Sequence, residues 1–249
     1  MLTPYLYLSH GWASSPERLA TAAAVTVGFA VLAHAVRGVN RSGALAGGLA
    51  CFLLFAGAGP TAFATLAALF LATWVSTRLG YRRKLALGLA ERREGRNVWQ
   101  VLANLAVPAF SSVIFGVTGN RTWLLAGVAA LAEAATDTVA SEIGQYRGQD
   151  ARLITTWERV PAGTDGGITI AGTVAGMAAG LMIVMVAAAG GMIHPAQLWI
   201  PLTAGIAGML FDSLLGATVQ RQGWISNQAV NFLSTLAAAA LAYTISTLT

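Results

Sequence analysis

Carboxylate side chains stand inside stretches of the sequence that are otherwise apolar. Glu133, Asp137 and Ser141 follow one another at intervals of four residues, so a helix places them on one face. Glu142 adjoins this stripe, and Asp212 lies in a separate apolar run. An ionisable group inside a membrane helix costs about 2.5–3.5 kcal/mol, so it usually faces a polar cavity and has a role. Carboxylate oxygens suit Mg²⁺, so we predict Asp137, Glu142 and Asp212 as its ligands, with interhelical hydrogen bonding as the alternative.

A glycine-rich segment lies directly before another apolar run. It contains Gly163, Thr164, Asp165, Gly166 and Gly167. The backbone N–H groups of such a turn, at the start of a helix, form a ready anion site, which predicts phosphate binding. The segment is not a Walker A motif, because no Gly-Lys-Ser/Thr sequence follows it. Its alternative role is to cap the helix through Thr164 or Asp165.

Amide and basic side chains supply further candidates. Asn227 and Asn231 stand four residues apart at the start of the last apolar run, and Asn104 lies near the start of another. For Asn227, capping of a helix is the alternative role. Lys84 and Arg78 belong to the most basic segment of the chain and could hold phosphates. Control of topology and contact with anionic lipid account for the other basic residues considered there, Arg92, Arg93 and Arg96.

The composition identifies the environment of these residues. Of the 249 residues, 56% are hydrophobic and only 10% are charged, and the mean hydropathy is +0.65. Soluble domains carry about 25% charged residues, so the composition disfavours a soluble enzyme, a disordered chain and a nucleic-acid-binding protein. The single cysteine, Cys51, allows neither a disulfide framework nor a thiolate metal site. The chain is therefore expected to be an integral membrane protein.

Eight apolar stretches approach the length needed to cross a bilayer, which is about 20 residues of helix. They cover residues 17–36, 42–59, 60–79, 98–118, 122–143, 167–191, 197–219 and 229–248. We predict an all-α, polytopic transmembrane bundle of about eight helices, formed as a single domain by residues 17–249. Only a Gly/Pro break before Pro60 separates the second and third stretches. Residues 1–16 lack the features of a signal peptide and are predicted to form a short interfacial segment.

Basic residues predict the orientation of this bundle. All lysines and arginines except Arg18 and Arg121 fall in loops on one side. The positive-inside rule places those loops in the cytoplasm and both termini on the outer side, in what we expect to be a bacterial cytoplasmic membrane. The pI near 10 is therefore a signal of topology and not of a nucleic-acid partner. The polar candidates gather near the cytoplasmic face.

Four segments, taken together, resemble one known family. They are Lys84 with residues 95–104, residues 135–144, residues 163–172, and residues 212–220 with Asn227 and Asn231. They are similar to segments of the integral-membrane family that contains plant phytyl-phosphate kinase and many bacterial, archaeal and animal members. The resemblance spans roughly residues 38–245, and the combination in this order is specific. The sequence departs from the family pattern at Asn97, where a second arginine is expected.

The resemblance implies a reaction and roles for the site residues. The reaction is CTP-dependent phosphorylation of an isoprenyl monophosphate, of phytyl, geranylgeranyl or farnesyl type, to the diphosphate. Mg²⁺ would be held by Asp137, Glu142 and Asp212, while residues 163–167 and Lys84 would cradle the nucleotide phosphates. The remaining binding residues would be Ser141, Asn104, Asn227 and Asn231. An apolar groove for the isoprenyl tail is expected beside Ala126, Gly127, Ala171, Gly172 and Gly176.

Two other functions remain open at this stage. One is a transporter or flippase for a lipid or a small anion, for which broken helices pointing at a substrate would be suitable. Against it, the polar residues gather at one face, and the sequence has no inverted repeat. The other is a membrane cytidylyltransferase that releases pyrophosphate, which would need the same metal site. The isoprenyl chain length, the nucleotide preference and the oligomeric state do not follow from the sequence.

Overall fold

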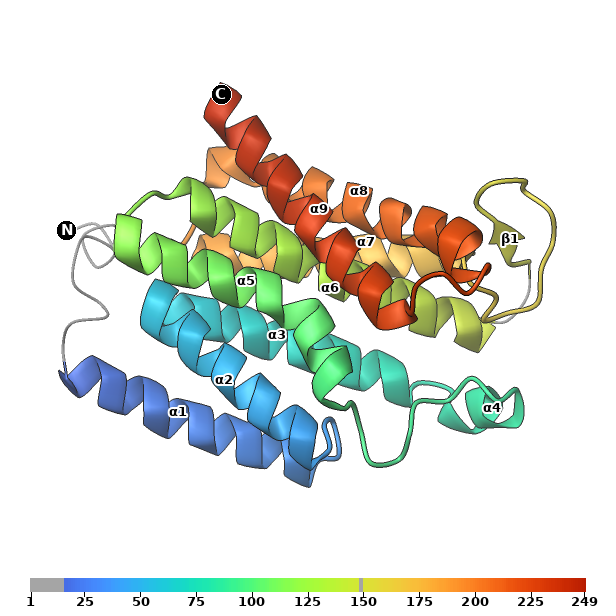
Figure 1. Ribbon diagram of the computed structural model, residues 1–249, viewed down its shortest axis with the longest axis horizontal. Coiled ribbons are helices and arrows are strands. Elements are labelled where there is room, and N and C mark those ends of the chain that lie inside the picture. Colours follow the sequence, from blue (N-terminus) through green and yellow to red (C-terminus); the bar gives the residue numbers. More distant parts are fainter. Residues whose placement is uncertain (1–15, 148–149) are drawn as a thin grey trace.

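Eight long helices make up most of the computed structural model, which describes residues 16–147 and 150–249 (Figure 1). Each of the eight, α8 together with its flanking short helices, is long and apolar enough to cross a membrane, which confirms the predicted bundle. They are α1 (Pro16–Ala35), α2 (Arg41–Ala58), α3 (Pro60–Arg78), α5 (Val98–Thr118), α6 (Thr122–Arg147), α7 (Ile170–Ala189), α8 (Trp199–Leu215) and α9 (Asn227–Leu248). The predicted interfacial segment lies almost entirely outside the described residues.

Shorter elements connect these helices. They are α4 (Tyr81–Ala86), β1 (Arg152–Leu153), β2 (Gly167–Ile168), the 3₁₀ helix η3 (Pro195–Gln197) and the π-helical segment η4 (Gly216–Gln220). The strands β1 and β2 pair in antiparallel fashion, with Arg152 opposite Ile168 and Leu153 opposite Gly167. Because β2 takes up Gly167 and Ile168, α7 begins at Ile170 and not at the predicted Gly167.

The short connection between α2 and α3 matches the break expected there. Gly59 has a φ of 84°, a left-handed conformation that glycine adopts without steric cost, and it ends α2. Pro60 then occupies the first turn of α3, where its missing N–H leaves no helical hydrogen bond unmade. The two helices are therefore separate spans.

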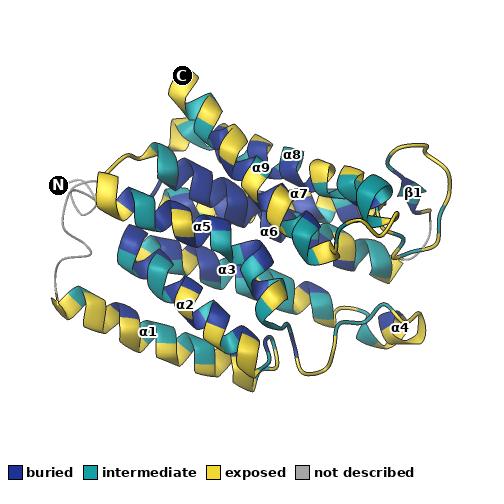
Figure 2. Cartoon of the chain, in the orientation of Figure 1, coloured by how far each residue is buried: buried dark blue, intermediate teal, exposed yellow. Residues whose placement is uncertain are grey.

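Helix α6 lies at the centre of the bundle, and its middle is dark blue in Figure 2. It contacts α3, α5, α7, α8 and α9. Small residues let α7 approach it closely, since a Cβ atom at Gly176 would lie 2.4 Å from the carbonyl oxygen of Thr136. Gly172 meets Ala140 of α6 in the same way. The expectation that these glycines leave a groove for a lipid tail is therefore wrong, because their neighbours fill the space.

The other small residues that were expected to border an apolar groove do not border one either. Ala126 and Gly127 are buried within the bundle, and a Cβ at Gly127 would come within 3.3 Å of Ser111 on α5. Ala171 is exposed at the start of α7. These residues therefore do not form the expected groove.

One end of the bundle carries α4, the loop of residues 87–97 and the β1–β2 hairpin, and we refer to it as the basic end. Figure 1 shows α4 and β1 together at the right of the view, with the C-terminus toward the opposite side. Several helices start at the basic end with side-chain caps. The capping residues are Asn40 for α2, Asn97 for α5, Thr169 for α7 and Ser226 for α9.

These caps settle two alternatives raised by the sequence. Asn97 and Gln100 form a reciprocal capping box at the start of α5, which gives a structural role to the position that departs from the family pattern. Ser226 caps α9, so Asn227 is not the cap. Thr169 caps α7, so neither Thr164 nor Asp165 does.

Candidate functional site

A cavity of about 280 Å³ opens at the basic end, and we call it the polar cavity. Residues of α5, α6, α8, η4 and α9 line it, together with residues 162–169. The lining includes every predicted site residue except Lys84, namely Asn104, Asp137, Ser141, Glu142, Gly163, Thr164, Asp165, Gly166, Gly167, Asp212, Asn227 and Asn231. Side chains separated by more than a hundred positions in the sequence thus share one space.

The carboxylates of α6 and α8 face this space from two sides. Asp137 and Asp212 both line the cavity and lie close enough for their charges to interact. The hydroxyl of Ser234 on α9 donates a hydrogen bond of 3.3 Å to Asp212. One turn deeper on α6, Glu133 is 1% exposed, and neither of its carboxylate oxygens has a hydrogen-bond partner among the described residues. Buried polar groups normally have partners, so Glu133 is an exception within the bundle.

The donor set fits a divalent cation, although with fewer protein ligands than expected. Among residues 16–147 and 150–249, no three His, Cys, Asp or Glu side chains are grouped so that they could hold a metal ion. The predicted trio of Asp137, Glu142 and Asp212 is therefore not assembled. Mg²⁺ is commonly held by only one or two carboxylates, with waters and substrate phosphates as its other ligands. Asp137 and Asp212 meet that requirement, since both carboxylates line the polar cavity.

Glu142 and Lys84 are committed to each other. Lys84 is completely buried, and its ammonium group forms an ion pair with the carboxylate of Glu142. The same ammonium donates hydrogen bonds to the carbonyl oxygens of Ser76, at 3.1 Å, and Thr77, at 2.8 Å. The hydroxyl of Thr77 donates to Glu142 at 2.9 Å. The predicted role of Lys84 in holding phosphates is therefore corrected, since its ammonium group is fully used in joining α3 and α4 to α6.

The glycine-rich turn lines the polar cavity but does not enter a helix directly. The N–H of Thr164 already donates to Pro161, and the N–H of Gly167 donates to Thr164, at 3.2 and 2.8 Å. Gly166, with a φ of 74°, packs against η4, where an added Cβ would lie 2.3 Å from the nitrogen of Ala217. The predicted glycine-rich turn is thus a folded turn that rests on η4, and α7 begins only at Ile170.

Asp165 adds a titratable group on this turn. Partial desolvation raises the pKa of its carboxyl group, while the charge of Arg221 and a hydrogen bond from Gln220 lower it in part. Gln220 also lies 3.5 Å from the side-chain oxygen of Asn227, to which its amide donates. The turn, η4 and the start of α9 therefore form one connected polar surface.

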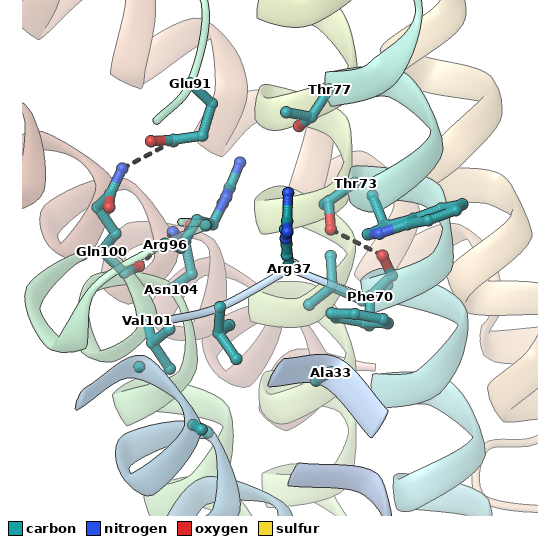
Figure 3. A pocket seen from close by; sticks show the side chains of 18 of the residues that line it. Ala33, Arg37, Phe70, Thr73, Thr77, Glu91, Arg96, Gln100, Val101 and Asn104 are labelled. Carbon is teal, nitrogen blue, oxygen red and sulfur yellow. Dashed lines mark hydrogen bonds between the residues drawn. The ribbon is translucent and has the colours of Figure 1, made fainter. Parts of the chain in front are cut away.

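A second cavity, of about 480 Å³, lies beside the first, and we call it the amphipathic cavity (Figure 3). Residues of α1, α2, α3, α5 and α6 and of the loop after α4 line it. The two cavities share a wall made of Glu91, Arg96, Gln100, Asn104 and Thr138. Sequence reasoning did not foresee this second cavity.

Arg96 is held in the shared wall by its backbone. Its N–H donates to the carbonyl of Gly38, and its own carbonyl accepts from the N–H of Asn40, at 3.1 and 3.0 Å. Gly95 and Gly43 allow this approach, since a Cβ at Gly43 would lie 2.2 Å from the Arg96 carbonyl oxygen. The charge of Arg96 also acts on Asp137. The assignment of Arg96 to topology alone was incomplete, although it lies in one of the segments that carry the family resemblance.

The amides of the shared wall are ordered by hydrogen bonds. The amide nitrogen of Gln100 donates to Glu91 at 2.9 Å, and its oxygen accepts from the N–H of Asn97 at 3.0 Å. Asn104 donates to the carbonyl of Gln100 at 2.9 Å. The side-chain oxygen of Asn104 is buried and has no hydrogen-bond partner among the described residues. It is an oriented acceptor between the two cavities.

The fold and the site define a multi-pass α-helical membrane protein with a polar site at one end of its bundle. The chain belongs to the family described as integral membrane protein DUF92, which matches residues 24–239. Relatives include an uncharacterized membrane protein of Synechocystis, sll0875, which is 34% identical over 196 residues, covering 76% of each chain. Protein VTE6, chloroplastic, of Arabidopsis thaliana is 32% identical over 80% of this chain and 62% of its own length. Protein PGR of the same plant is 31% identical over 86% of this chain and 83% of its own. No solved structure matches the chain.

Proposed function

We propose that the protein is a membrane kinase that transfers the γ-phosphoryl group of CTP to an isoprenyl monophosphate. The observation that carries this proposal is the polar cavity, in which Asp137 and Asp212 converge beside Arg96. The reaction itself is taken from the resemblance of the four sequence segments to the family of plant phytyl-phosphate kinase. A cavity with carboxylates for a metal and a guanidinium for phosphates suits the positioning and charge neutralisation on which phosphoryl transfer depends.

The proposed reaction can proceed without strong acid–base catalysis by the protein. An anionic phosphate oxygen of the acceptor attacks the γ-phosphorus of CTP and forms the new bond between phosphorus and oxygen. The bond from that phosphorus to the oxygen bridging the β and γ positions breaks, and CDP leaves with the electron pair. The nucleophile already carries negative charge, so a strong general base is not required.

The residues of the polar cavity divide into three roles under this proposal. Asp137 and Asp212 hold Mg²⁺, which supplies charge neutralisation at the nucleotide phosphates when it is bound. Arg96 stabilises the negative charge of the transferring group through a planar pair of N–H donors. Asn227, Asn231 and the turn of residues 163–167 contact the nucleotide.

The decisive experiment follows the products. Purified protein is incubated with labelled CTP, Mg²⁺ and geranylgeranyl monophosphate, and geranylgeraniol serves as the acceptor control. We expect CDP and geranylgeranyl diphosphate in equal amounts from the monophosphate, and no product from the alcohol. Pyrophosphate with a CDP-linked lipid would instead identify a cytidylyltransferase. Movement of the lipid phosphate across liposomes without any chemical change would identify a transporter.

A further inference from the structure

The amphipathic cavity changes character along its length. Arginines surround its upper part, where Arg37 and Arg96 reach toward the space shown in Figure 3. Below them, Phe70, Ala33 and Val101 form an apolar part. Small residues of α2, among them Gly47 and Gly48, extend the apolar lining. A cavity that is cationic at one end and apolar at the other matches an amphiphile with an anionic headgroup.

The charges around the upper part are unbalanced. The basic residues that line it are Arg37, Arg78, Arg92, Arg93 and Arg96. Glu91 is the acidic residue among the lining, and its carboxylate accepts hydrogen bonds from Gln100 and from the N–H of Arg92. Among the described residues, neither Arg37 nor Arg96 forms an ion pair with an acidic side chain. This cluster of guanidinium groups suits a phosphate, which Arg binds through two parallel hydrogen bonds.

Two of these residues are held in place by the fold. Arg78 stacks over the Trp74 ring at 4.3 Å and donates a hydrogen bond to the carbonyl of Val36. Arg37 lies in the turn after α1 and adopts a φ of 55°, which is uncommon for a residue with a side chain. The turn between α1 and α2 thus presents Arg37 to the cavity at a conformational cost, which tertiary contacts maintain.

We propose that the amphipathic cavity is the acceptor site, holding an isoprenyl monophosphate with its phosphate at Arg37 and Arg96 and its tail between α1, α2 and α3. This inference rests on the proposed function. It places the acceptor phosphate at the shared wall, where Asn104 and Thr138 separate it from the polar cavity. The two reacting phosphates therefore meet at Arg96, each from its own cavity. The depth of the apolar part then determines which chain lengths are accepted.

Binding can be tested without catalysis. Full-length protein in nanodiscs is labelled with a photoreactive farnesyl monophosphate analogue, in the absence of nucleotide and metal. We expect crosslinks on α1, α2 and α3, and competition by geranylgeranyl monophosphate but not by geranylgeraniol. Crosslinks confined to α7, α8 and α9 would overturn the assignment.

A matched pair of variants tests the headgroup. We expect Arg37→Gln to weaken binding of geranylgeranyl monophosphate about tenfold, because a charge-assisted hydrogen bond to phosphate is lost. Arg41→Gln is the control, since Arg41 is exposed at the start of α2 and lines neither cavity. Equal affinity of the two variants would overturn the headgroup assignment.

A second pair tests the tail. A Cβ at Gly47 would have Val101 as its nearest neighbour, at 3.8 Å, so Gly47→Leu can be accommodated by the backbone and fills the apolar part. We expect it to lose about tenfold in affinity for the geranylgeranyl chain while it retains the shorter geranyl chain. Gly28→Leu on α1 is the control, because nothing lies within 4 Å of the added Cβ. An unchanged chain-length preference would contradict the assignment of the tail.

The outcomes separate this inference from the proposed function. Saturable binding that depends on Arg37 and Gly47, without transfer from any nucleotide, supports the acceptor site and rejects the kinase. Kinase activity that is the same in both variants as in their controls supports the kinase and rejects this acceptor site.

Discussion

Lys84 and Glu142 form an ion pair that is buried between α4 and α6, with no part of the lysine exposed. The sequence analysis predicts both residues for one site, Glu142 as a ligand of Mg²⁺ and Lys84 as a residue that holds phosphates. Their pairing ties the first helix after α3 to the central helix, directly beside the polar cavity. A lysine that could have bound phosphate instead fixes the position of the loop that carries Arg96.

Breaking this ion pair should destabilise the protein. Removal of one partner from a buried pair leaves an uncompensated charge and costs about 3–5 kcal/mol. Lys84→Met should therefore lower the melting temperature in detergent strongly, and Lys84→Met with Glu142→Leu should recover much of the loss. Arg159→Met is the control, since its pair with Asp150 is about three-quarters exposed and contributes little. If Lys84→Met has normal stability but binds nucleotide more weakly, the structural role is contradicted and Lys84 binds phosphate.

Asp137 and Asp212 should act as one unit. Asn is nearly isosteric with Asp but neutral, so Asp137→Asn and Asp212→Asn should each abolish Mg²⁺-dependent turnover without unfolding the protein. The double variant should be no worse than either single variant, because groups that hold one ion are not additive. Asp150→Asn, at an exposed position outside both cavities, is the control. Near-normal activity in either single variant would exclude that residue as a ligand.

The position of the glycine-rich turn can be tested with a pair of glycines. Gly166 and Gly223 have almost the same positive φ, 74° and 75°, so alanine is strained at both. Only at Gly166 would the added Cβ also collide with η4, since nothing lies within 4 Å at Gly223. Gly166→Ala should lower nucleotide affinity at least about tenfold, as measured by equilibrium binding, while Gly223→Ala should retain it. Equal affinities would remove the turn from the nucleotide site.

The orientation of the bundle remains a prediction that reporters can test. A reporter fused to the C-terminus should be external, and one inserted after Glu91 should be cytoplasmic, because basic loops stay on the cytoplasmic side. A second insertion after Glu158 should also be cytoplasmic. A cytoplasmic C-terminus would reverse the proposed access of nucleotide to the polar cavity.

The spans could be predicted because they depend on local properties. Apolar length and the Gly59–Pro60 break identify α2 and α3 as separate helices without any knowledge of their neighbours. The same is true of the α6 stripe, whose spacing placed Asp137 on the face that lines the cavity. The short elements α4, β1 and β2 could not be predicted, because tertiary contacts stabilise them more than their own sequence does.

The partners of individual side chains did not follow from the sequence. Lys84 and Glu142 are far apart along the chain, and no spacing rule relates a loop lysine to a helix carboxylate. Arg96 stands among other arginines that topology alone would explain, and its position depends on close backbone contacts at Gly43 and Gly95. The amphipathic cavity arises where five helices and the loop after α4 meet, so no single periodicity indicates it.

The two cavities also differ in when they can form during synthesis. Chains emerge and insert from the N-terminus. The lining of the amphipathic cavity ends at Thr138 on α6, whereas the polar cavity requires Asn227 and Asn231 on α9. The whole lining of the proposed acceptor site is thus synthesised before the last three membrane spans. The nascent protein therefore acquires a lipid-sized, cationic chamber first, and the compartment that contains its carboxylates is closed only by the final helix to enter the bilayer.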